Sequence, residues 1–280
     1  MSDFVQVICE NCVPTGFGAV GEHGLALIVG VGGRKILFDT GQGIGLINNA
    51  KLAGVNLAEA EFLVLSHAHK DHTGGIMDFL DAVGRKVIIG HPGIFEPRSA
   101  IYKFGEREVK MPIGIPWSRA DVEAAGGEFN LKAQPFEIMP EVWFSGEIPM
   151  RNDFESTDAN LYIVSDDKAV LDPFPDDAAL FVITQRGLTV ISGCAHRGIV
   201  NTMAYARELF GKKPVYAVIG GFHLGNATPE RIGKTIKAFK DYGAKTVATG
   251  HCTGLPGACK LAHELGNTFQ FLWAGRKIEI

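Results

Sequence analysis

The sequence predicts a single α/β domain over residues 1–280, built from two similar halves with helices outside two sheets. Each half begins with strand patterns and continues with alternating strands and helices, the order expected for layered α/β proteins. No linker-like segment separates the halves. Hydrophobic residues make up 46% of the chain and charged residues 21%, which is ordinary for a soluble globular protein with one core.

The first half is expected to start as a hairpin-rich sheet. Residues 4–9 (FVQVIC) alternate apolar and polar side chains, as strands with one buried face do. Gly32 and Gly33 separate two apolar runs, which predicts a tight turn between strands. A weak helix is expected to end at Leu52. Further on, the pattern predicts strands at 61–66 and 86–90 and a helix at 73–83.

Residues 91–160 differ in character from the rest of the chain. They hold seven prolines, many glycines and few periodic runs. Long irregular stretches are uncommon in compact domains unless they have a function. We therefore expect an irregular insertion that forms a lid over the functional site, and a plain irregular connection is the alternative.

The second half returns to regular elements. Two apolar runs, ALFVIT and LTVIS, lie on either side of a turn at residues 185–187. Thr228 is placed to cap the N-terminus of a helix over residues 229–242. The remaining predictions are a helix at 199–210 and strands at 215–220 and 245–250.

Charge and cysteine content limit the function classes. The net charge of −4 gives no basic surface for nucleic acid. No apolar run reaches the roughly 18 residues of a membrane helix, and the N-terminus has no signal-peptide pattern. Five cysteines, an odd number, do not suggest a disulfide framework. We expect a cytoplasmic protein with reduced thiols, including the Cys9–Cys12 pair, and no nucleic-acid or membrane partner.

The segment SHAHKDH, directly after the apolar run 62–65, predicts a metal site. His67 and His69 are two residues apart, so in extended chain they point the same way and can share one ion. Asp71 and His72 lie where the chain turns into a helix and can face a second ion. Imidazole and carboxylate ligands suit zinc, manganese or iron.

Later histidines can complete two coordination shells. His196 and His251 each follow an apolar strand and a glycine, and ligands gather in the loops at the carboxyl ends of strands. His223 follows a strand and two glycines but is surplus to six ligands, so we expect it to face the substrate. Arg197 is expected beside it, because a guanidinium suits a phosphate.

Four segments in this order resemble the metallo-β-lactamase superfamily: ILFDTGQG with Asp39, LSHAHKDHTGG, a mid-chain histidine and TGHCTG. The resemblance implies a four-layer αββα sandwich with a metal site between the sheet edges. It also implies that Asp39 supports a ligand from behind. The segments SGEIPMRNDFE, SGCAHRGIVNT and IGGFHL are similar to the branch that includes the archaeal dihydropterin–ribofuranosylaminobenzene phosphate synthase and metal-dependent hydrolases.

Cys194 departs from the superfamily pattern, in which an aspartate that bridges the two ions commonly ends a strand at such a place. A thiolate could bridge the ions, or Cys194 could stand by while His196 supplies the ligand. The sequence favours the second interpretation, with Cys194 close to the metals but not bound to them.

The resemblance implies an enzyme with two divalent ions, of which zinc is the first candidate. We expect a dinuclear hydrolase of a phosphorylated or diphosphorylated small molecule, with Asp71 as a catalytic residue as well as a ligand. One alternative is a transferase that joins a dihydropterin diphosphate to an aromatic amine with loss of diphosphate. Another is a metal-binding sensor without catalysis. A homo-oligomer is compatible with the sequence.

Overall fold

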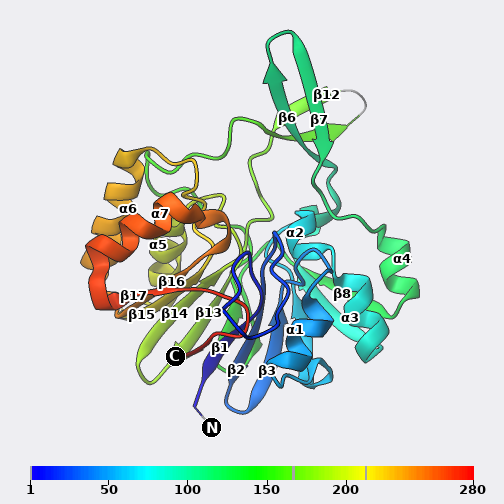
Figure 1. Cartoon of the computed structure of the whole chain (residues 1–280), viewed down its shortest axis with the longest axis horizontal. Coiled ribbons are helices and arrows are strands. Elements are labelled where there is room, and N and C mark those ends of the chain that lie inside the picture. Colours follow the sequence, from blue (N-terminus) through cyan, green and yellow to red (C-terminus); the bar gives the residue numbers. More distant parts are fainter. Residues whose placement is uncertain (1, 166–167, 212) are drawn as a thin grey trace.

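Two seven-stranded sheets face each other in the centre of the protein, with helices on both outer faces (Figure 1). The computed structural model describes residues 2–165, 168–211 and 213–280. Helices α5 (Ile199–Phe210), α6 (Pro229–Asp241) and α7 (Gly254–Leu265) cover one sheet, and α1 (Leu46–Leu52), α3 (Ile76–Val83) and α4 (Arg119–Ala124) lie on the side of the other. The αββα sandwich implied by the sequence is thus confirmed. Among the described residues, each helix is too short or too polar to cross a lipid bilayer.

The first sheet has the strand order β18-β1-β2-β3-β4-β5-β8. The predicted hairpin and alternating strands form as expected, and Gly32 and Gly33 make the turn with positive φ angles of 59° and 85°. The elements are β1 (Phe4–Cys9), β2 (Ala26–Val31), β3 (Arg34–Phe38), α1 (Leu46–Leu52), η1 (Leu57–Glu59), β4 (Ala60–Val64), α2 (Lys70–Thr73), α3 (Ile76–Val83), β5 (Lys86–Gly90), η2 (Pro92–Phe95), α4 (Arg119–Ala124), β8 (Gly127–Leu131) and β18 (Lys277–Glu279).

The second sheet has the order β17-β16-β15-β14-β13-β10-β9. The predicted helix at 199–210 forms over those residues, and the Thr228 side chain accepts a hydrogen bond from Arg231 N as the N-cap of α6. The elements are β9 (Phe136–Met139), β10 (Val142–Phe144), β13 (Ala179–Thr184), β14 (Gly187–Ser192), α5 (Ile199–Phe210), β15 (Val215–Gly220), α6 (Pro229–Asp241), β16 (Thr246–Thr249), η3 (His251–Thr253), α7 (Gly254–Leu265), η4 (Gly266–Thr268) and β17 (Phe269–Phe271).

Three apolar layers hold the sandwich together. The central layer lies between the sheets and contains fully buried side chains such as Leu27, Phe38 and Leu180. Two outer layers lie between each sheet and its helices, around Phe79 on one side and Phe239 on the other. Burial of apolar surface at roughly 25 cal/mol per Å² makes these layers the main stabilising contribution.

The parallel strands bring the functional loops to one edge of the sandwich. In the first sheet Phe38 pairs with Val64 and Val64 with Ile89. In the second sheet Ser192 pairs with Gly220 and Gly220 with Thr249. The segments that follow β3, β4, β14, β15 and β16 therefore start side by side, and they carry the histidines and aspartates singled out in the sequence.

Residues 91–160 are more regular than their composition predicts. β8 pairs with β5 in the first sheet, and β9 and β10 join the second sheet. The prolines lie between or at the ends of these short elements, as with Pro135 and Pro140, because proline cannot donate to a central ladder. The expectation of a wholly irregular insertion is corrected accordingly.

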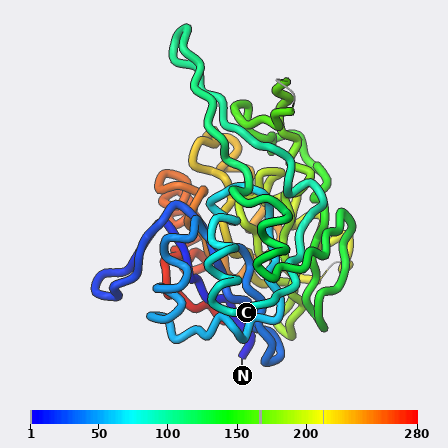
Figure 2. Tube along the Cα trace, turned by 90° about the vertical axis from the view of Figure 1, so that its right-hand side faces the viewer, coloured from blue at the N-terminus to red at the C-terminus, as the bar shows by residue number. Residues whose placement is uncertain are grey.

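What leaves the sandwich is a four-stranded third sheet in the order β12-β11-β6-β7, here called the arm. It consists of β6 (Arg98–Phe104), β7 (Arg107–Pro112), β11 (Leu161–Ser165) and β12 (Lys168–Leu171). Its β6–β7 hairpin projects from the body of the protein in both views (Figures 1 and 2). The arm extends past residue 160, the end expected for the insertion.

A buried ion cluster ties the root of the arm to the SHAHKDH loop. Arg98 Nε lies 2.6 Å from Asp172 Oδ2, and Arg98 Nη2 lies 2.6 Å from Asp176 Oδ1. All three side chains are fully buried. The second oxygen of Asp176 accepts a hydrogen bond of 2.8 Å from the backbone N–H of Ala68. The arm and the loop are thus held by the same carboxylate.

Replacing Arg98 should destabilise the protein strongly. Arg98→Ala leaves two buried carboxylates without their cation, which costs about 3–5 kcal/mol of unfolding free energy. The exposed Arg85–Glu128 pair provides the control, because Arg85→Ala at a surface ion pair should cost about 0–1 kcal/mol. Equilibrium unfolding in urea measures both variants, and equal losses would contradict this account of the cluster.

Candidate metal centre

The SHAHKDH segment forms an extended loop followed by one turn of helix. After β4 the chain stays extended through His69, which has φ −63° and ψ 143°, and α2 then begins at Lys70. The rings of His67 and His69 lie with centroids 4.6 Å apart. Asp71 and His72 lie on α2, where the sequence predicted the turn into a helix.

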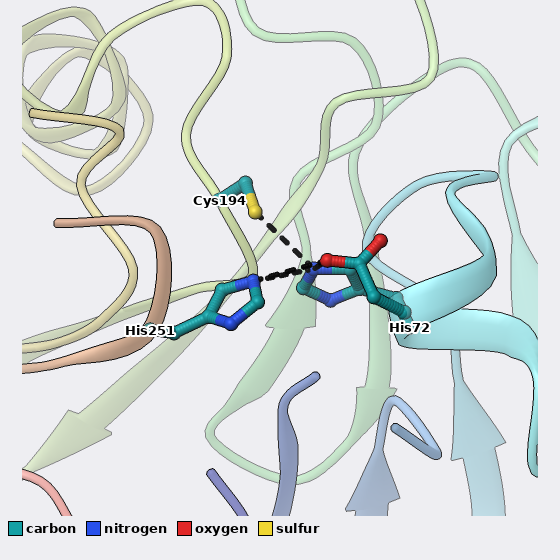
Figure 3. A group of neighbouring side chains, drawn as sticks. His72, Cys194 and His251 are labelled. Carbon is teal, nitrogen blue, oxygen red and sulfur yellow. Dashed lines mark hydrogen bonds and ion pairs between the residues drawn. The ribbon is translucent and has the colours of Figure 1, made fainter. Parts of the chain in front are cut away.

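One group of ligand atoms combines Asp71, His72, Cys194 and His251, whose donor atoms lie within 4.8 Å of one another (Figure 3). His72 Nε2 is 3.2 Å from His251 Nε2 and 3.2 Å from Cys194 Sγ. Asp71 Oδ2 is 3.3 Å from His251 Nε2. Four buried donors of nitrogen, oxygen and sulfur at this spacing are suited to one transition-metal ion.

A second group combines His67, Cys194 and His196, again with donor atoms within 4.8 Å of one another. The ring of His69 lies 4.6 Å from that of His67 and 4.8 Å from that of His196, measured between centroids. Cys194 belongs to both groups. The structure therefore brings together all six predicted ligands.

Unpartnered buried nitrogens show that these residues fit a metal ion. The Nε2 atoms of His67, His69 and His196 are buried and have no hydrogen-bond partner among the described residues. A buried polar atom without a partner costs about 1–3 kcal/mol, and such atoms are rare in native proteins. Coordination of a cation would satisfy all three.

The protonation states of the second group also favour a cation. Burial lowers the pKa of His67 and His69 well below the ordinary value, and neighbouring imidazoles lower it further. Burial, assisted by His223, lowers the pKa of His196 to about 4. These imidazoles are therefore neutral at pH 7, which is the form that binds metals.

In the first group, neighbouring charges together shift the pKa values more strongly than burial does. Burial lowers the pKa of His72, but the carboxylates of Asp71 and Asp39 overcome this effect and raise it to about 10. Burial raises the pKa of Asp71, yet His72 and His251 bring it well below the ordinary value. This group thus stabilises positive charge, and binding of an ion there would displace a proton from His72.

Asp39 supports both groups from behind. Its Oδ2 lies 2.7 Å from His72 Nδ1 and accepts a hydrogen bond of 2.7 Å from Ser66 Oγ. Its Oδ1 accepts a hydrogen bond of 2.7 Å from Ser66 N. Ser66 Oγ is in turn 2.9 Å from His67 Nδ1. Asp39 therefore contacts a candidate ligand, His72, as the resemblance implied, and reaches a second histidine, His67, through Ser66.

Glycines let the two sheet edges approach each other. A Cβ at Gly193 would lie 2.1 Å from Ser66 Oγ and 3.0 Å from Asp39 Oδ2. A Cβ at Gly250 would lie 2.3 Å from a carboxylate oxygen of Glu10. Each is closer than a real side chain allows, so only glycine fits at these positions.

Several supporting residues were not found from the sequence. Glu10 accepts a hydrogen bond from the backbone of His251, and Asn11 Oδ1 lies 2.9 Å from His251 Nδ1. They sit inside the Cys9–Cys12 pair, where only the cysteines drew attention. His23 Nε2 lies 3.3 Å from Asp71 Oδ2, and Asp158 lies beside two histidines. No local motif marks these last two.

A cavity of about 460 Å³ opens beside the two groups. It is lined by His69, Asp71, Cys194 and His196 of the two groups and by residues of the arm such as Tyr102 and Met111. Its other lining residues include His223, Lys70 and Cys252. The arm thus borders the site, and His223 lies in the cavity as expected.

Arg197 does not lie where the sequence predicted. Its Nη1 is 2.6 Å from Glu147 Oε1, and its backbone N–H donates to Asp177 Oδ2 over 2.8 Å. The side chain lines a different cavity of about 370 Å³, together with Glu147 and Tyr205. Positive φ angles at Ala195 (55°) and Gly198 (98°) turn the chain on both sides of His196 and Arg197, and the two neighbouring side chains line different cavities.

Comparisons with known proteins identify the family of this chain. The family model described as the metallo-β-lactamase superfamily matches residues 20–211 of this chain. The chain is 35% identical over 268 residues to the 7,8-dihydropterin-6-methyl-4-(β-D-ribofuranosyl)-aminobenzene-5'-phosphate synthase of Methanocaldococcus jannaschii, with 92% of this chain and 90% of that protein covered. It is 28% identical over 280 residues to an uncharacterized protein of the same organism, with 99% and 100% covered.

Among solved structures, a metal-dependent hydrolase of the β-lactamase superfamily superposes with a TM-score of 0.84, at 28% identity and with 99% of both chains covered. The protein therefore belongs to the metallo-β-lactamase superfamily and is an enzyme of that superfamily. The resemblance to the branch that contains the synthase is confirmed by the identity with the archaeal relative.

The contacts of Asp39 predict a large effect on metal binding. Asp39→Asn removes the charge that orients His72, so affinity for zinc should fall roughly 10- to 100-fold. Competition with a chromogenic chelator measures the affinity. Asp78→Asn, on the exposed side of α3, is the matched control and should change nothing. Unaltered affinity in Asp39→Asn would remove the supporting role.

Proposed function

We propose that the protein is a dinuclear metal-dependent hydrolase that cleaves a phosphorylated or diphosphorylated small molecule. The observation that carries this proposal is the pair of ligand groups that meet at Cys194 beside a cavity of about 460 Å³. A cavity of this size accommodates a small molecule. The similarity to a solved metal-dependent hydrolase supports the same class of reaction.

The first ion would be held by His67, His69 and His196, and the second by Asp71, His72 and His251. The sequence favoured Cys194 as a non-ligand, but its Sγ belongs to both groups and lies 3.2 Å from His72 Nε2. This position supports a thiolate shared by the two ions. Imidazole, carboxylate and thiolate together suit zinc best, with manganese or iron as alternatives.

The two ions would supply the chemistry usual for such pairs: a lowered pKa of bound water and compensation of charge on phosphoryl oxygens. The chain itself positions the reactants. The Asp71 carboxylate lines the cavity and is suited to hold the attacking water by a hydrogen bond. Lys70 lies next to it in the same lining, and its ammonium can bind an outer phosphate oxygen, the role that the sequence assigned to Arg197.

A transferase is the second candidate, and the 35% identity with the archaeal synthase favours it. In that reaction an aromatic amine would take the place of water, and diphosphate would leave from the dihydropterin. Both candidates need the same metal centre and an anion-binding cavity. They differ only in the nucleophile that enters from the cavity.

Loss of one ligand from either group should remove one ion. His196→Ala and His251→Ala should each lower the metal content by about one ion per chain, because each histidine belongs to a different group. Elemental analysis by mass spectrometry gives the content directly. His263→Ala, on the exposed side of α7, is the control and should keep the full content. Retention of all ions in both site variants would disprove the assignment.

Turnover in the absence of an amine separates the two candidate functions. The zinc-loaded protein is incubated with a panel of phosphodiesters and diphosphates, and release of phosphate or diphosphate in water alone indicates a hydrolase. Product formation only after addition of an aromatic amine would replace this proposal by the transferase. Lys70→Ala should lower kcat/KM roughly 10- to 100-fold by loss of a charge-assisted hydrogen bond, while Lys103→Ala at the exposed part of the arm should not.

A further inference from the structure

We propose that the protein has a third cation site, formed by Cys252 and His223 together with Cys194, which takes a thiophilic divalent ion such as zinc or cadmium. This site shares Cys194 with the two ligand groups of the proposed hydrolase centre, whereas Cys252 and His223 belong to neither of them. The proposal rests on the proposed function only through Cys194, which the third site would share with the dinuclear centre.

The three side chains converge from three strand ends. His223 follows β15, Cys252 lies in η3 after β16, and Cys194 follows β14. Their two sulfur atoms and one ring nitrogen of His223 lie within 4.8 Å of one another. Zinc bonds are about 2.3 Å to sulfur and about 2.0–2.1 Å to nitrogen, so small side-chain movements let one ion reach all three atoms.

Asp158 supports His223 as a ligand. His223 Nε2 lies 2.7 Å from Asp158 Oδ2, so this nitrogen faces a carboxylate. Nδ1 is buried without a hydrogen-bond partner among the described residues, and a cation bound there would displace any proton that it carries. A carboxylate behind a histidine in this way is the usual support of a metal-bound imidazole.

The backbone is shaped around this cluster. His223 has φ 47°, as does His251, and non-glycine residues with positive φ concentrate at functional sites. A Cβ at Gly221 would lie 2.6 Å from Cys252 Sγ and 3.4 Å from Cys194 Cα, so glycine is required for the two cysteines to approach. The backbone N–H of His223 donates to Cys252 Sγ over 3.3 Å, a contact that supports a ligand sulfur.

The donor set determines the kind of ion. Two thiolates and one imidazole form a softer set than the imidazole-rich and carboxylate-containing main groups, and soft ligands select zinc or cadmium over manganese. Cys252 and His223 both line the 460 Å³ cavity. Three protein ligands at a cavity wall leave a coordination position for a ligand that enters from it, as in catalytic rather than structural zinc sites.

Cadmium titration of the metal-depleted, reduced protein tests the site. Cys252→Ser should lose one ion per chain and part of the thiolate-to-cadmium absorbance, and His223→Ala should lose the same ion. Asp158→Asn should weaken that ion's affinity roughly 10- to 100-fold. Cys259→Ser, an exposed cysteine on α7, is the matched control and should alter neither signal. Circular dichroism verifies folding, and Cys252→Ala provides a second variant.

Two results would overturn the third site. One is an unchanged cadmium content and absorbance in both Cys252 variants. The other is a Cys194–Cys252 disulfide, found by peptide mass spectrometry under the same reducing conditions. If two ions remain in wild type and Cys252→Ser alike, only the third site fails and the hydrolase proposal stands. If the wild type binds none, both fail.

Discussion

The metal centre depends on one buried carboxylate. Asp39, at the end of β3, joins the end of the first sheet to two metal-site histidines, His72 directly and His67 through Ser66. Its φ of 61° is unusual for an aspartate and turns the chain back at the sheet edge. A buried charge is stable only when it is paired and hydrogen-bonded. The hydrogen bonds of Asp39 to Ser66 and its contact with His72 therefore stabilise both the carboxylate and the SHAHKDH loop.

Close approach of the two sheets is the second constraint. The loops that follow β14, β15 and β16 can reach the SHAHKDH loop only because glycines stand where any Cβ would collide, at Gly193, Gly221 and Gly250. The result is a cluster of buried imidazoles whose nitrogens face one another. Such a cluster is unfavourable by itself and becomes favourable with cations, so folding at this edge and metal binding are coupled.

The arm is anchored at the same edge of the sandwich and lines the cavity beside the candidate metal centre. Its root is anchored by Arg98 to Asp172 and Asp176, and Asp176 also holds the loop of the metal centre at Ala68. Farther out, Tyr102 and Met111 line the cavity while remaining partly exposed. Part of the cavity lining is therefore carried by an element attached to the SHAHKDH loop.

The sequence by itself determined most strands of the two main sheets, several helices and the six candidate ligands, because strand alternation, apolar runs and the spacing of the histidines in SHAHKDH are local signals. Tertiary structure decided the rest. In the folded protein, Arg197 pairs with Glu147 instead of facing the metal site, and Cys194 belongs to both ligand groups. Several prolines of residues 91–160 lie between short strands that join the main sheets. Asp158 and His23 have no local motif, since each acquires its partner only when segments distant in the chain meet at one sheet edge.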